Sequence, residues 1–123
     1  MVKAERLIRT AFYAAAILVI WLSLSPKAVT PDMHGGDKLA HLLAYGPLSF
    51  LGLLGYSAKR HILPLVISLV ALGILLEFVQ SQIGRHLSLG DMLANTAGVL
   101  LAIVPARFAV HWLARRWAFG RRN

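Results

Sequence analysis

Polar side chains that could bind a ligand or carry out chemistry first appear together at the start of an apolar run. Asp37, His41 and Tyr45 are four residues apart, and Lys38 follows the first of them. Residues four apart lie on the same face of a helix. The spacing therefore predicts a polar stripe on one helix face, made of a carboxylate, an imidazole and a phenol.

Two further polar groups follow in the second half of the chain. Glu77 and Gln80 are three residues apart at the end of an apolar run, and Arg85 comes shortly after them. Asp91 and Asn95 are four apart at the start of the next apolar run. Each pair would share one face of its helix. We expect the three groups to meet at one end of a helical bundle.

A ligand-binding pocket is the function that these residue types favour. Arg85, with Lys38 nearby, could contact a phosphate or carboxylate, because a guanidinium binds such groups through two hydrogen bonds. Glu77, Asp91 and Asn95 would orient Arg85 and accept hydrogen bonds from sugar or peptide groups. His41 and Tyr45 would form the inner wall. The predicted binding residues are Asp37, Lys38, His41, Tyr45, Glu77, Gln80, Arg85, Asp91 and Asn95.

A small membrane hydrolase or transferase that acts on an outer-leaflet lipid or a lipid-linked precursor is the alternative. His41 could act as a general base, with Asp37 one turn away to orient it. Glu77 and Asp91 could divide the acid and base roles between two carboxylates. The candidate nucleophiles are Ser81 and Ser88, which lie in no recognisable catalytic motif. The sequence leaves open whether the protein is an enzyme.

Structural roles and metal binding are two further interpretations of the same residues. Asp91, three residues after Ser88, has the spacing of a capping box and could simply stabilise the start of its helix. Glu77 lies about one turn inside its apolar run, where a helix cap is not needed. The candidate metal ligands are His34, Asp37, His41, Glu77, His86 and Asp91. Because no His-x-x-x-His or His-Glu-x-x-His pair is present, we expect no metal and no cofactor.

The rest of the sequence must place these residues in a membrane. Of the 123 residues, 58% are hydrophobic and only 15% are charged, and the apolar residues come in long blocks. A helix of about 20 residues crosses the hydrocarbon core of a bilayer. The sequence predicts an all-α, four-helix membrane bundle with short loops, forming a single domain. The expected spans are residues 7–24, 37–56, 62–80 and 89–112, followed by a basic tail, 113–123.

The distribution of basic residues predicts an orientation. Ten of the 13 Lys and Arg residues lie in the N-terminal stretch, in the second loop, or from Arg107 onward. The positive-inside rule then places both termini in the cytoplasm and the three polar groups at the extracytoplasmic end. The net charge of +8 fits anionic lipid better than nucleic acid, because the apolar runs are long. Small residues, such as Ala94 and Gly98, would allow close helix packing, including in a homo-oligomer.

The polar residues also form a series of sequence motifs in a fixed order along the chain. The motifs are Asp37-Lys38-x-x-His41-x-x-x-Tyr45, Glu77-x-x-Gln80, Gly84-Arg85 and Asp91-x-x-x-Asn95-x-x-Gly98. This pattern resembles the VanZ-like family of small bacterial membrane proteins and covers roughly residues 37–101. The resemblance implies a multi-pass protein of the bacterial inner membrane. Because the family is named for a member linked to teicoplanin resistance, it also implies a lipid-linked or glycopeptide ligand.

Overall fold

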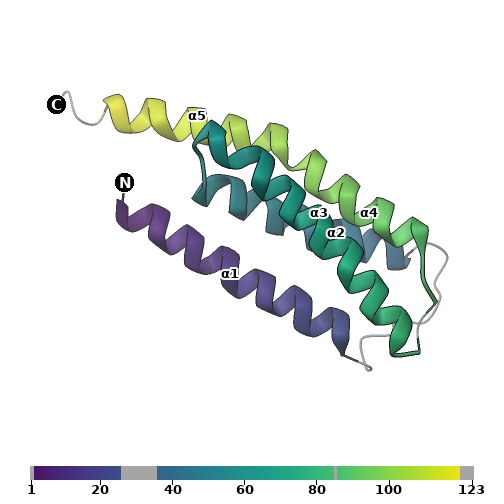
Figure 1. Cartoon of the computed structure of the whole chain (residues 1–123). Coiled ribbons are helices and arrows are strands. Elements are labelled where there is room, and N and C mark those ends of the chain that lie inside the picture. Colours follow the sequence, from purple (N-terminus) through teal and green to yellow (C-terminus); the bar gives the residue numbers. More distant parts are fainter. Residues whose placement is uncertain (1, 26–35, 85, 120–123) are drawn as a thin grey trace.

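The chain folds into long helices joined by short connections (Figure 1). The computed structural model describes residues 2–25, 36–84 and 86–119, with side chains described for 3–25, 36–84 and 86–115. Within these ranges the regular structure is entirely helical, as predicted. The helices are α1 (Val2–Leu24), α2 (Gly36–Gly55), α3 (Lys59–Gln82), α4 (Leu89–Leu101) and α5 (Ile103–Phe119).

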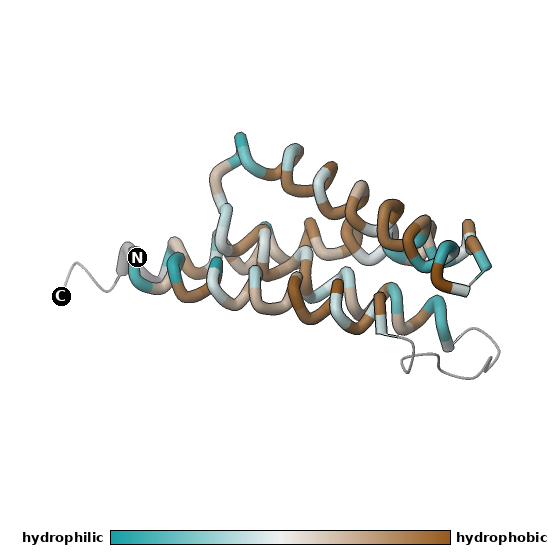
Figure 2. The backbone as a smooth tube through the Cα atoms, turned by 60° about the horizontal axis from the view of Figure 1, so that its bottom comes forward, coloured by the Kyte–Doolittle hydropathy of each residue, from teal (hydrophilic) through white to brown (hydrophobic). Residues whose placement is uncertain are grey.

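The first three predicted spans coincide with α1, α2 and α3, and the fourth coincides with α4 and α5 together. Three helical segments are long and apolar enough to cross a membrane: Lys3–Leu24, Lys59–Gln82 and Leu89–Arg115. The tube in Figure 2 shows hydrophilic residues toward the helix ends and hydrophobic residues between them. Helix α5 continues to Phe119, so the predicted tail begins as helix.

Helix α2 is the centre of the bundle and is not among the three apolar spans. It contacts every other helix, most extensively α4. Its buried residues are Tyr45, Leu48, Ser49, Gly52, Leu53 and Gly55. Because the other helices cover α2, its polar residues can be surrounded by protein. This position explains how the most polar predicted span fits in an otherwise apolar bundle.

The close contact between α2 and α4 depends on Gly98. A Cβ atom added to Gly98 would lie 2.7 Å from the carbonyl oxygen of Leu42 and 3.0 Å from the amide nitrogen of Gly46. Just beyond this crossing, the Ser49 hydroxyl donates a 3.1 Å hydrogen bond to the Val99 carbonyl oxygen. Gly98 therefore permits backbone approach within one chain, as small residues do in membrane helix pairs.

A proline accounts for the interruption between α4 and α5. Pro105 has no amide hydrogen, so the carbonyl oxygen of Leu101 loses its usual partner four residues later. Helix α4 ends at Leu101 and α5 begins at Ile103. The interruption of the last span thus lies about one turn before Pro105. By contrast, α2 runs through Pro47 as a continuous helix.

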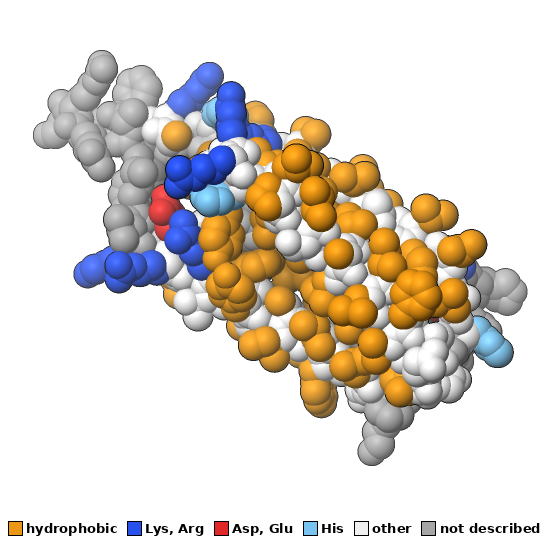
Figure 3. All heavy atoms as spheres, viewed as in Figure 1, with side chains coloured by type: hydrophobic (Ala, Val, Ile, Leu, Met, Phe, Trp, Pro, Cys, Tyr) orange, Lys and Arg blue, Asp and Glu red, His pale blue; other side chains and the backbone are white. Residues whose placement is uncertain are grey.

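Basic side chains gather at the end of the bundle where both termini lie (Figures 1 and 3). Two of the arginines there hold the turn between α2 and α3. Arg9 donates a 2.7 Å hydrogen bond to the Gly55 carbonyl oxygen and stacks 4.6 Å from the centre of the Tyr56 ring. Arg107 donates a 3.0 Å bond to the Ser57 carbonyl oxygen. Arg9 thus binds the last carbonyl of α2, and Arg107 binds a carbonyl of the turn that follows it.

Candidate functional site

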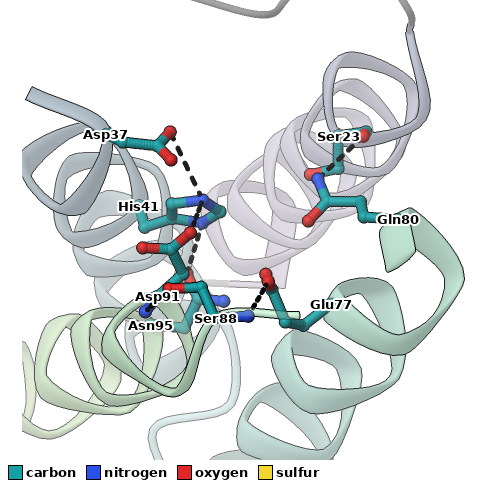
Figure 4. Close-up of polar contacts among 8 residues, drawn as sticks. All are labelled: Ser23, Asp37, His41, Glu77, Gln80, Ser88, Asp91 and Asn95. Atoms are coloured by element: carbon teal, nitrogen blue, oxygen red, sulfur yellow. Dashed lines mark hydrogen bonds and ion pairs between the residues drawn. The ribbon is translucent and has the colours of Figure 1, made fainter. Parts of the chain in front are cut away.

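The opposite end of the bundle contains a buried polar cluster. It lies where α1 and α3 end and where α2 and α4 begin, so four helices contribute to it (Figure 4). Its buried polar residues are Glu77, Gln80, Asp91 and Asn95, each at most 3% exposed. The structure therefore brings together side chains from all three polar groups of the sequence.

His41 connects the two helices that form the core of the cluster. Its Nδ1 atom is 3.0 Å from the Asn95 Oδ1 atom. Its Nε2 atom is 3.8 Å from an Asp37 carboxylate oxygen and 3.6 Å from an Asp91 carboxylate oxygen. Figure 4 shows Asp37 on one side of the His41 ring and Asp91 and Asn95, both from α4, on the other. Asp37 is partly exposed, whereas the Asp91 side chain is buried.

The contact with Asn95 fixes the orientation of the His41 ring. With the amide oxygen of Asn95 toward the ring, Nδ1 is the donor, because an amide oxygen only accepts hydrogen bonds. Nε2 then faces the carboxylates of Asp37 and Asp91. It does so either as the second N–H of an imidazolium or as a lone pair directed at two negative groups. Both ring nitrogens are therefore engaged with neighbouring side chains.

Glu77 and Ser88 join the end of α3 to the start of α4. The Ser88 side-chain oxygen accepts a 3.2 Å hydrogen bond from the Asp91 amide, so Ser88 is the N-cap, as predicted. In a full capping box, the side chain of Asp91 would bind the Ser88 amide in return. Here that amide donates to Glu77 Oε1 at 2.9 Å instead. Glu77 thus takes over half of the cap, and the Asp91 carboxylate faces His41.

Two buried polar atoms at the cluster lack a hydrogen-bond partner among the described residues. They are Glu77 Oε2 and the Tyr45 hydroxyl oxygen. Glu77 is 2% exposed and Tyr45 is 1% exposed, and the charge of Glu77 lies within electrostatic range of the Tyr45 phenol. A buried polar group without a partner costs about 1–3 kcal/mol. Figure 4 shows the Glu77 carboxylate pointing from α3 toward Ser88 and His41.

Gln80 is held differently from the other predicted site residues. Its side-chain amide donates a 2.8 Å hydrogen bond to the Ser23 carbonyl oxygen at the end of α1. Figure 4 shows this pair set apart from His41 and Asp91. Gln80 therefore ties α1 to α3, and it borders the cluster without being part of its centre.

Of the two predicted cationic residues, Lys38 and Arg85, the structure describes only Lys38. The Lys38 side chain is exposed and lies across the start of α4, where its Cε atom would be 2.6 Å from a Cβ atom added to Gly90. Lys38 is therefore at the rim of the cluster. Arg85, the residue expected to contact an anion, lies outside the described residues, as does His34. His86 is exposed.

The two candidate nucleophiles have structural hydrogen bonds. The Ser81 hydroxyl donates to the Phe78 carbonyl oxygen at 2.6 Å. Ser88 caps α4, as described above. Neither is paired with His41 in the described part of the chain. This arrangement gives less support to covalent catalysis than to binding.

Sequence reasoning missed the glycine that lets α3 approach the site. A Cβ atom added to Gly73 would lie 3.1 Å from the Asn95 Cβ atom and 3.3 Å from Tyr45 Cε1. Gly73 precedes Glu77 by one helical turn and shares its face. The four-residue spacing between Gly73 and Glu77 was the sequence signal that could have indicated this close approach.

An apolar groove opens beside the cluster, between α2 and the α4–α5 rod. It has a volume of about 380 Å³. Its lining includes Leu42, which follows His41 in the sequence, and the two glycines of the α2–α4 crossing, Gly46 and Gly98. The other lining residues are Pro47, Phe50, Leu101, Ala102 and Pro105.

Comparisons of the chain with known protein families, with curated proteins and with solved structures find no match. The likeness to the VanZ-like family therefore rests on the sequence motifs alone and stays a prediction.

Proposed function

We propose that this protein is a polytopic membrane protein that binds the polar head of a membrane amphiphile at the buried cluster. The observation that carries the proposal is the pair of unpartnered atoms, Glu77 Oε2 and the Tyr45 hydroxyl, at the cluster. A ligand that hydrogen-bonds to them would recover the free energy that their burial costs. Three helices long and apolar enough to cross a membrane support the choice of a membrane ligand.

The neighbouring groove supports a ligand with an apolar chain. Leu42 lines the groove and is adjacent in sequence to His41, so the apolar surface begins where the polar cluster ends. An amphiphile has the matching order of polar head and hydrocarbon tail. Most small-molecule sites combine an apolar lining with a few fixed polar groups.

The charges of the cluster indicate what the head should contain. The carboxylates of Asp37 and Asp91 face one imidazole, and the carboxylate of Glu77 binds the Ser88 amide at the same end of the bundle. Carboxylates accept hydrogen bonds, so they favour sugar hydroxyls and amines in the ligand. Lys38 at the rim, and Arg85 by its sequence position, would contact phosphate or carboxylate groups. An envelope lipid or a lipid-linked cell-wall precursor carries both kinds of group.

The proposed setting is the bacterial inner membrane, with both termini in the cytoplasm and the cluster facing outward. The placement of Arg9, Arg107 and the other basic residues at one end supports this orientation through the positive-inside rule. The VanZ-like motifs add the proposal that a glycopeptide antibiotic, or the wall precursor that such antibiotics bind, is the relevant ligand.

A membrane enzyme acting on an outer-leaflet lipid is the second proposal. It is favoured by one observation, the buried carboxylates of Glu77 and Asp91 near an oriented imidazole. It is weakened because neither candidate nucleophile, Ser81 or Ser88, is paired with His41 in the described part of the chain. Turnover of a co-purified lipid would distinguish an enzyme from a binding protein.

The first test is native mass spectrometry of the protein extracted in nanodiscs together with its surrounding lipid. We expect the wild type to retain a species of defined mass that is enriched over the bulk lipid. Glu77→Gln keeps the size of the side chain but removes its charge, and should reduce retention about tenfold, the effect of roughly 1.4 kcal/mol. Arg85→Ala should reduce retention if the head carries an anionic group.

Ser49→Ala is the matched control, because Ser49 is also buried and polar but bonds to Val99 in the middle of the bundle. It should retain the species at the wild-type level. A wild-type spectrum that contains only bulk lipid, or equal retention by Glu77→Gln and the wild type, would contradict the proposal.

A further inference from the structure

We propose that Asp37, His41 and Asp91 form a site for a divalent transition-metal ion such as Zn²⁺, with Glu77 beside it. The inference rests on the proposed function and deepens it, because the cation would lie in the same site as the headgroup of the ligand. It differs from the expectation drawn from the sequence, where no paired histidines pointed to a metal. The ligands come instead from an Asp-x-x-x-His pair on α2 and an aspartate on α4.

The three donor atoms are already close to the spacing that a metal requires. His41 Nε2 and one oxygen from each of Asp37 and Asp91 lie within 4.8 Å of one another. Tetrahedral ligands at ordinary Zn–N and Zn–O distances are roughly 3.3 Å apart. His41 Nε2 is 3.8 and 3.6 Å from the two carboxylates, so small side-chain movements would complete the geometry.

The orientation of His41 is the one expected for a metal ligand. Such a histidine usually donates its other ring N–H to an oxygen, which fixes the ring and the tautomer. Asn95 Oδ1 provides this oxygen at 3.0 Å from Nδ1. Nε2 faces Asp37 and Asp91, so a cation placed between them would be bound by its lone pair together with the two carboxylates.

Glu77 gives an independent indication of a ligand. It is 2% exposed, and its Oε2 atom has no hydrogen-bond partner among the described residues. Its Oε1 atom is fixed by the Ser88 amide, and the carboxylate points toward His41 (Figure 4). Oε2 lies outside the group of three ligand atoms, where it could accept a hydrogen bond from a metal-bound water. This contact would provide the missing partner.

The charges also favour a cation. Two aspartates, one of them buried, face His41, and carboxylate charge that is not compensated in an apolar interior is costly. A divalent ion between the two aspartates would compensate such charge. Imidazole and carboxylate ligands suit Zn²⁺, Mn²⁺ or Fe²⁺, whereas the thiolates that select Cu⁺ are missing because the chain has no cysteine.

The test uses the full chain in detergent, stripped of metal with a chelator and then titrated with Zn²⁺ alone by calorimetry. The expected result is one tightly bound Zn²⁺ per chain. Asp91→Asn and Asp37→Asn should each weaken binding by at least about 100-fold, because each removes a charged ligand. Circular dichroism should show unchanged helix content, and Asp37→Asn, which changes a partly exposed residue, remains informative if Asp91→Asn does not fold.

His61→Gln is the matched control, because His61 contacts Tyr56 and Arg60 at the basic end of the bundle. It should bind Zn²⁺ like the wild type. No tight binding by the wild type, or equal binding by the Asp37 variant, would overturn the inference. Retention of the amphiphile by the metal-stripped protein would in that case leave the proposed function standing. Zn²⁺ binding without any retained amphiphile would contradict the proposed function alone.

Discussion

Gly98→Ala is expected to destabilise the bundle by about 1–3 kcal/mol, the range observed when atoms are added to a well-packed interior. The added methyl group would lie 2.7 Å from the Leu42 carbonyl oxygen and 3.0 Å from the Gly46 amide nitrogen. Both are backbone atoms, so they cannot move aside as a flexible side chain would. The two helices must separate, and the helix that carries His41 would move away from the helix that carries Asn95.

Gly46→Ala is the matched control for this change. A Cβ atom at Gly46 would meet its nearest neighbour, the Gly98 carbonyl oxygen, at 3.8 Å, an ordinary contact. Thermal unfolding in detergent, followed by circular dichroism, should show a clearly lower midpoint for Gly98→Ala and a nearly unchanged midpoint for Gly46→Ala. Equal midpoints for the two variants would show that the crossing is not as close as described.

Asn95→Leu is expected to cost about 1–3 kcal/mol and to abolish ligand retention. Leucine cannot accept the hydrogen of His41 Nδ1, which would then be left without its partner in a mostly buried site. The branched side chain would also press on Gly73. The space there is small, because a Cβ atom added to Gly73 would lie only 3.1 Å from the Asn95 Cβ atom. Thermal unfolding and native mass spectrometry of the same preparations would measure both effects.

The neighbouring Thr96→Val is the control for Asn95→Leu. Thr96 is only part-buried, and its hydroxyl bonds to the Met92 carbonyl oxygen within its own helix. Losing such a bond changes helix stability little. Thr96→Val should therefore keep both the unfolding midpoint and the retained ligand. If Asn95→Leu behaved in the same way, the hydrogen bond to His41 would have no part in holding the cluster together.

The helices and the meeting of the three polar groups could be predicted because both follow from periodicity. Long apolar runs set the helices, and spacings of three or four placed Asp37 with His41 and Asp91 with Asn95 on shared faces. Short connections then brought the polar ends together. These signals lie within single segments of sequence, where the distance along the chain determines the distance in space.

The partners across helices could not be predicted in the same way. That Glu77 completes the cap of α4, and that Gln80 bonds to the Ser23 carbonyl oxygen, depends on how α3 is rotated against its neighbours. The central place of α2 likewise arises from packing, and hydropathy alone gives no sign of it. Small residues suggested close contacts, but the partner of Gly98 was visible only once α2 and α4 were side by side.

The central claim is that the polar cluster opens toward the outer face of a membrane, where envelope ligands are found. Single-cysteine labelling tests it most directly, and the absence of native cysteine makes the experiment clean. Lys59→Cys is at the basic end and His86→Cys is near the cluster, and both positions are exposed. In intact cells, a membrane-impermeant maleimide should label position 86 and not 59, and permeabilisation should expose both. Labelling of position 59 but not 86 from outside would place the cluster on the cytoplasmic face and contradict the account.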